Sequence, residues 1–147
     1  MKHVVVPGVV LGVLVGAWTF VMGFTGWYKH PTLNALFFAV VVIEIGVLIW
    51  ALRASAKDGG TYGRQVGRGL LISVVGGLII IASSLIFTLV AFPRYFEELK
   101  ALQAELKLPE RPDVIQTPLA QALAGFAGTV ITGLLASLLI SLVARKK

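Results

Sequence analysis

The stretch VVVIEIGVLIW (residues 40–50) places a single carboxyl, Glu44, inside an unbroken apolar run. The apolar segment extends over about residues 32–52, which is long enough for a helix that crosses a hydrocarbon layer. Its thirteen Leu, Ile, Val and Phe residues favour insertion by roughly 4 to 8 kcal/mol, against a cost of about 3 kcal/mol for one central acid. We therefore predict a transmembrane helix that tolerates Glu44.

Three further segments have the length and composition of transmembrane helices, at about residues 4–27, 69–92 and 119–143. The chain is 14% charged, whereas soluble domains carry about 25% charged residues. The link after the third segment is the longest, and the helical spacing of its apolar residues predicts an amphipathic helix over about residues 94–107. Thr117 and Pro118 form a suitable N-cap and first turn for the last segment. We predict one integral membrane domain over residues 1–147, an all-α bundle of four transmembrane helices with an amphipathic helix in the third, outer loop.

Lysine and arginine are distributed unevenly around these four segments. One side of the membrane would hold eight cations and one acid, and the other side five cations and five acids. Because cytoplasmic loops carry an excess of Lys and Arg, we predict that the N- and C-termini are cytoplasmic. This placement also accounts for the net charge of +6 without a nucleic-acid partner.

The residue types that catalysis and cofactor binding require are scarce. There is no cysteine, and the two histidines, His3 and His30, lie far apart in the sequence. No Ser-His-Asp set, phosphate-binding loop or metal-ligand spacing is present. We therefore expect no enzyme activity, no cofactor and no metal site.

Small residues recur every four positions and predict close helix contacts, because helices in lipid associate through tight packing. The same rows are alternatively a homo-oligomer face or the lining of a polar pathway. The predicted packing glycines are Gly8, Gly12, Gly16, Gly69, Gly77, Gly125, Gly128 and Gly133.

Depth matching along the four helices predicts what surrounds Glu44. The hydroxyls expected at its level are those of Ser73, Thr132 and Ser137, and no cation reaches that depth. A carboxyl without water or a counter-charge favours its neutral form. We hypothesise that a protonated Glu44 donates a hydrogen bond to a hydroxyl or a carbonyl. The alternative is a proton or cation relay, since acids inside membranes commonly mark such pathways.

Four cations follow the second segment and precede the third, namely Arg53, Lys57, Arg64 and Arg68. Near an anionic membrane surface each contributes about 1 kcal/mol. These residues are candidates for contact with anionic lipid, and the alternative is that they only set the topology.

Four stretches resemble a bacterial membrane family, the domain of unknown function 4199. They are GGTYGRQVGRGLLIS (59–73), FPRYFEE (92–98), TPLAQAL (117–123) and GLLASLLISLVARKK (133–147). The resemblance implies a four-span fold in the bacterial inner membrane, and it implies no activity.

Two functions remain open from the sequence. The first is a non-catalytic accessory, scaffold or lipid-associated subunit, with the lipid bilayer and other membrane-protein subunits or further copies of the chain as partners. The alternative is a small oligomeric proton- or cation-linked carrier or channel that uses Glu44.

Overall fold

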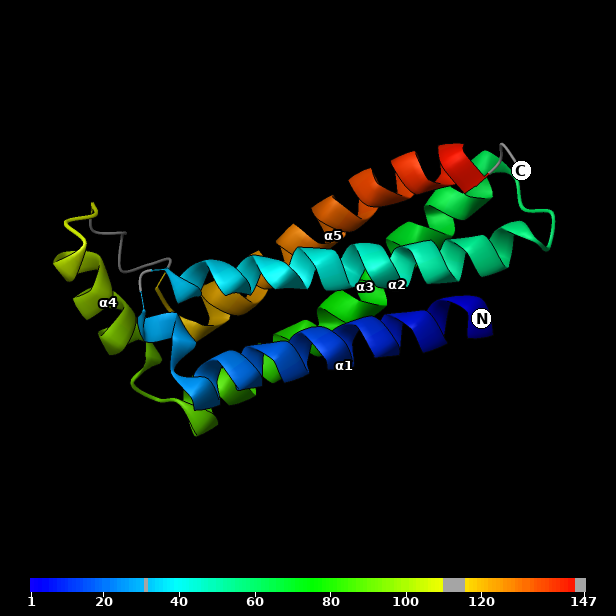
Figure 1. Ribbon diagram of the computed structural model, residues 1–147. Helices are drawn as coiled ribbons and strands as arrows, with labels where there is room; N and C mark the ends of the chain where they lie inside the picture. Colours follow the sequence, from blue (N-terminus) through cyan, green and yellow to red (C-terminus); the bar gives the residue numbers. More distant parts are fainter. Residues whose placement is uncertain (31, 110–115, 145–147) are drawn as a thin grey trace.

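The computed structural model describes residues 1–30, 32–109 and 116–144. Four long helices form a bundle: α1 (Lys2–Thr25), α2 (Ala39–Ala56), α3 (Tyr62–Ile86) and α5 (Pro118–Ala144) (Figure 1). A shorter helix, α4 (Tyr95–Glu105), lies across one end, which we call the α4 end. The opposite end, where α1 begins and α5 ends, is the terminal end. The described residues contain no strand, so the predicted all-α bundle with a helix in the third loop is confirmed.

Short irregular helices close the bundle at the α4 end. The 3-10 helices η1 (Trp27–Lys29) and η2 (Leu33–Phe38) make the connection from α1 to α2. Gly26 ends α1 with a φ of 70°, a left-handed conformation that glycine adopts without strain. A π-helical turn, η3 (Phe87–Ala91), ends the third span, and the Phe92 N–H donates to the Phe87 carbonyl at 2.8 Å.

The helix bounds depart from the predicted spans, most of all at the start of α3. Helix α3 begins at Tyr62 rather than near residue 69, so that Arg64 and Arg68 lie in its first two turns. The predicted start of the third span was placed directly after its last charged residue. A charged residue marks the edge of the apolar layer rather than the start of the helix. The second span begins with the 3-10 helix η2 before it becomes α-helical at Ala39. The Trp18 indole N–H donates to the Leu36 carbonyl at 3.0 Å and ties η2 to α1.

The predicted cap of the last span is present. The Thr117 hydroxyl oxygen accepts a hydrogen bond from the Ala120 N–H at 3.2 Å, and Pro118 is the first residue of α5.

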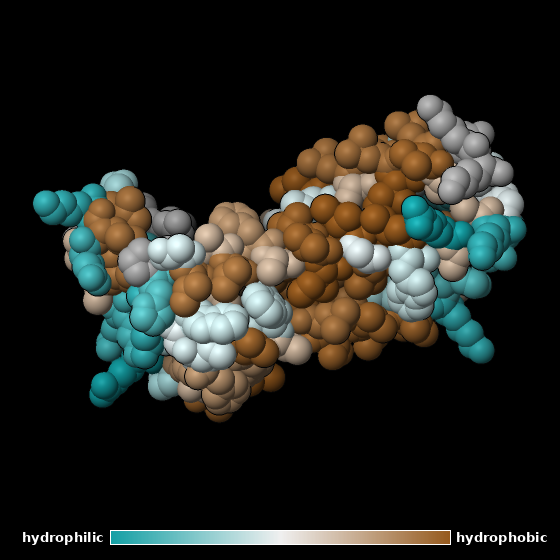
Figure 2. All heavy atoms as spheres, viewed as in Figure 1, coloured by the Kyte–Doolittle hydropathy of each residue, from teal (hydrophilic) through white to brown (hydrophobic). Residues whose placement is uncertain are grey.

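The surface carries an apolar band between two polar ends (Figure 2). Four described helices are long and apolar enough to cross a membrane. Large apolar side chains on all four are exposed at the surface, among them Val42, Leu78 and Leu139. Such a band is unsuited to water and matches the hydrocarbon layer of a bilayer. The protein is therefore an integral membrane protein.

Helix α3 is the centre of the bundle, because it packs most extensively against both α1 and α5, and α2 closes the other side against the same two helices. Two adjacent glycines of α3 allow these close contacts with α1 and α5. A Cβ added at Gly76 would lie 2.8 Å from Leu11 on α1, and one added at Gly77 would lie 2.6 Å from Phe126 on α5. The buried apolar core comprises Leu11, Val15, Val47, Leu48, Ala51, Ile72 and Ile80.

A second core at the α4 end is aromatic. Phe87 is fully buried, and its ring lies 4.7 Å from that of Phe92 and 5.2 Å from that of Tyr95, measured between centroids. Tyr28 and Met22 complete the buried set. These rings attach α4 and η1 to the ends of α1 and α3.

Candidate functional sites

Glu44 lies between three helices near the middle of the bundle. Its side chain points from α2 toward α3 and α5, and the residue is only 4% exposed. The Ser73 hydroxyl on α3 donates to Glu44 Oε1 at 3.2 Å, and Thr132 Oγ1 on α5 lies 2.5 Å from Glu44 Oε2. No described cation forms an ion pair with Glu44. The structure thus brings together Glu44 and two of the three hydroxyls predicted at its depth.

Thr132 Oγ1 has more neighbours than its one proton can serve. Besides Glu44 Oε2, it lies 2.8 Å from the Gly128 carbonyl and 3.3 Å from the Thr129 carbonyl. A hydroxyl donates one proton and can accept others. A protonated Glu44 that donates to Thr132 Oγ1 leaves the threonine proton for Gly128, so that both short contacts contain a proton. This is the arrangement that the hypothesis of a protonated Glu44 requires.

Ser137, the third predicted hydroxyl, lies one helical turn further along α5. It is fully buried, and its hydroxyl donates to the Gly133 carbonyl at 2.6 Å rather than to Glu44. It faces Gly69 on α3, where an added Cβ would lie 1.9 Å from Ser137 Oγ. Ser137 therefore belongs to the contact between α3 and α5.

Six of the eight predicted packing glycines lie against another helix. Gly8, Gly12 and Gly16 on α1 face Val75, Ile79 and Ser83 on successive turns of α3, and an added Cβ would approach these side chains to between 2.5 and 3.1 Å. On the other side of α3 the close approaches are at Gly69, Gly77 and Gly133.

The remaining two glycines make no close contact. A Cβ at Gly125 would reach Ile80 only at 3.5 Å, and one at Gly128 would meet nothing within 4 Å. Both residues are exposed on α5.

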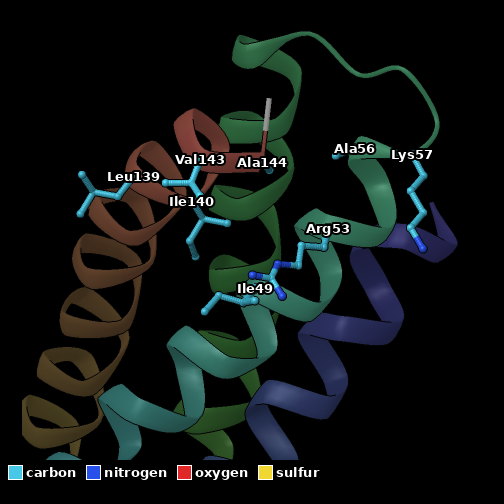
Figure 3. Close-up of a pocket in the computed structure, with 8 residues that line it drawn as sticks. All are labelled: Ile49, Arg53, Ala56, Lys57, Leu139, Ile140, Val143 and Ala144. Carbon is cyan, nitrogen blue, oxygen red and sulfur yellow. The ribbon is translucent and has the colours of Figure 1, made fainter. Parts of the chain in front are cut away.

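The four predicted basic residues do not form one cluster. Arg68 donates to the Ser55 hydroxyl, and Arg64 is exposed on the first turn of α3. Arg53 and Lys57 instead line a groove of about 620 Å³ at the terminal end, which we call the α2–α5 groove (Figure 3). The groove is lined by Ile49, Arg53, Ala56 and Lys57 from α2 and by Leu139, Ile140, Val143 and Ala144 from α5.

A second hollow, which we call the α2 notch, lies further around α2, away from α5. It has a volume of about 520 Å³, shares Ile49, Arg53 and Lys57 with the groove, and adds Gly46, Trp50 and Ala54. Gly46 has no neighbour within 4 Å of an added Cβ, and Trp50 is 54% exposed. The row Ile49, Arg53, Lys57, with one residue per helical turn, therefore separates two apolar hollows.

A polar contact at the α4 end was not predicted from the sequence. The Tyr28 hydroxyl donates to Glu98 Oε2, and Lys29 Nζ lies 3.1 Å from Glu98 Oε1. Burial and the hydrogen bond to Glu98 raise the pKa of Tyr28. Burial alone would raise the pKa of Glu98, but the hydrogen bonds from Tyr28 and Lys29 outweigh it and hold that pKa below its ordinary value. The only indication of it in the sequence was that the turn after the first span is basic and that the predicted helix of the outer loop is acidic at its start.

We predict that Tyr28→Phe lowers the free energy of unfolding by about 1.5 kcal/mol at neutral pH, since it removes one hydrogen bond to a charged group. A carboxyl whose pKa is depressed in the folded state stabilises the fold above its unfolded pKa, and this contribution is lost as the pH falls through the folded pKa. The difference between wild type and Tyr28→Phe should therefore shrink in acid. Melting curves in detergent at neutral and acidic pH measure it, with Glu97→Gln, an exposed neighbour on α4, as the control. A difference that is unchanged in acid would exclude the ionised Glu98 as the partner.

Comparison with protein families shows what the chain is similar to. The family model described as "Protein of unknown function (DUF4199)" matches residues 7–146. Comparison with curated proteins and with solved structures found no match.

Proposed function

Because the chain belongs to the family Protein of unknown function (DUF4199), which brings no activity with it, we propose a function from the geometry alone. The protein is a non-catalytic integral membrane protein that acts as an accessory, scaffold or lipid-associated subunit. It resides in the bacterial inner membrane with both termini in the cytoplasm. The basic residues Arg53, Lys57, Arg64 and Arg68 all lie in or beside the connection from α2 to α3, at the terminal end, which supports this orientation through the excess of cations there.

The observation that carries this proposal is the enclosure of Glu44. It is the only acidic residue in the four spans. Both of its oxygens lie against hydroxyls of neighbouring helices, and only 4% of the residue is exposed. A coupling acid in a carrier must reach water in at least one state and pass its proton to another group. Glu44 instead joins α2 to α3 and α5, which is a structural role.

Reconstitution into lipid vesicles that contain a pH-sensitive dye tests this proposal against the carrier alternative. We expect proton flux at the level of empty vesicles, for wild type and for Glu44→Gln alike. A flux above that level that disappears in Glu44→Gln would establish the carrier and overturn the proposal.

Native mass spectrometry after extraction in a gentle detergent tests the association itself. We expect retained lipid, retained membrane subunits, or both. A bare monomer released from gently treated membranes would contradict a lipid-associated or accessory role.

A further inference from the structure

The α2–α5 groove and the α2 notch both combine apolar surface with positive charge. These two features match the acyl chains and the anionic headgroup of a phospholipid. The α2–α5 groove is lined by aliphatic side chains of both helices, and the apolar lining of the α2 notch comes from α2 alone, from Ile49, Trp50 and Ala54. Arg53 and Lys57, which are spaced by one helical turn, are among the lining residues of both hollows. Figure 3 shows Arg53 and Ile49 on one side of the groove and Leu139, Ile140 and Val143 on the other.

The two cations have no acidic partner among the described residues. The described ion pairs join His3 to Asp58 at 4.0 Å and Lys29 to Glu98. Asp58, which follows Lys57 directly in the sequence, is thus directed toward α1. The positive charge of Arg53 and Lys57 remains available to an anion from outside the chain.

The position of this charge along the helix also indicates the headgroup region. Arg53 lies in the last turn of α2, and Lys57 follows the helix directly. The exposed ring of Trp50 lies one turn before them, as is common for aromatic residues at a membrane boundary. The cations therefore stand at the level of lipid headgroups, and both hollows extend from them toward the acyl chains.

We infer that the terminal end binds one two-chain phospholipid with an anionic headgroup. Its phosphate is held by Arg53 and Lys57, one acyl chain lies in the α2–α5 groove, and the other lies in the α2 notch. The site rests on the proposed function as a lipid-associated protein and names the lipid class. A guanidinium offers parallel N–H donors that match phosphate oxygens, and a neighbouring ammonium adds a second charge. A free phosphate would use the two cations but neither apolar hollow.

Lipid titration followed by native mass spectrometry tests the site on the full chain in detergent. The probes are phosphatidylglycerol, which is anionic, and phosphatidylcholine, which is zwitterionic, with matched acyl chains. Wild type should bind phosphatidylglycerol more tightly. Each of Arg53→Gln and Lys57→Gln should weaken that binding about fivefold, and the double variant about 30-fold. Arg64→Gln, which removes an exposed cation of the same end that lines neither hollow, should leave it unchanged.

A second pair of variants tests the groove rather than the charge. Val143→Trp fills the α2–α5 groove from its exposed side, whereas Leu142→Trp places the same ring on a neighbouring exposed position that does not line it. Only Val143→Trp should weaken binding of both lipids. Melting temperatures of all variants show that each is folded.

Three results would overturn the inference. They are equal affinity for the two lipids in wild type, a double variant that binds as wild type does, and a Val143→Trp variant that cannot be distinguished from Leu142→Trp. The last result would mean that lipid is held only by electrostatic attraction at the surface and that no acyl chain lies in the α2–α5 groove. These outcomes leave the proton-flux measurement untouched, so failure of the lipid site and failure of the proposed function can be told apart.

Discussion

Gly133→Ala should destabilise the bundle by about 1 to 3 kcal/mol, the range for overpacking a tightly packed interior. The added methyl carbon would lie 1.8 Å from Ser73 Oγ, 2.6 Å from Ser73 Cβ and 2.8 Å from Glu44 Oε1. Relief requires α5 to move away from α3, which also separates Thr132 from Glu44. One methyl group therefore weakens a helix contact and the hydrogen bonds beside it.

Gly128→Ala is the matched control, because it lies on the same helix and an added Cβ there has nothing within 4 Å. Both substitutions change helix propensity equally, so the difference between them reports packing alone. Thermal unfolding in detergent should show a clear loss for Gly133→Ala and none for Gly128→Ala. Equal melting temperatures for the two variants would contradict the close approach of α5 to α3.

Glu44→Gln should abolish a protonated-carboxyl stretching band that wild type shows at neutral pH in infrared spectra. Under the hypothesis of a protonated Glu44, the acid donates to Thr132 Oγ1 and the threonine hydroxyl donates to the Gly128 carbonyl, at oxygen–oxygen distances of 2.5 and 2.8 Å. The amide of glutamine can donate at the same place, so the fold should persist. Spectra of wild type that contain only carboxylate bands would disprove the neutral form.

Variants of Thr132 serve as controls for the same band. Thr132→Val keeps the side-chain shape but removes the oxygen that accepts the Glu44 proton, and the band should shift to higher frequency with a loss of about 1 kcal/mol of stability. Thr132→Ser keeps the hydroxyl and should keep the band. A band that does not respond to Thr132→Val would arise from another carboxyl.

The membrane spans were predictable because length and apolar composition are strong signals that need no partner. The contacts of Glu44 with Ser73 and Thr132 could also be predicted from the sequence, because antiparallel transmembrane helices of known length can be aligned by their depth in the membrane. Depth alone does not give rotation. Ser137 has a suitable depth but faces Gly69, and Gly128 continues a small-residue row but has no atom within 4 Å of an added Cβ.

Two other features depend on how distant segments meet, which no local pattern contains. Tyr28 and Tyr95 occur in stretches typical of a boundary that faces lipid, but both are buried in the aromatic core because α4 folds across the end of the bundle. Similarly, Arg53 and Lys57 share a groove because α5 lies beside α2, whereas Arg68 turns to Ser55. The four cations are equivalent in sequence and differ only in their surroundings.

The adjacent glycines Gly76 and Gly77 also limit how the length of the chain can change. Successive residues of a helix are about 100° apart around its axis, so these two direct α3 toward α1 and toward α5, respectively. Insertion or deletion of a single residue along this central helix would rotate one half of it by that angle relative to the other. The glycine contacts with α1 and with α5 would then no longer align with their partners, so we expect changes in the length of α3 to be tolerated only at its ends.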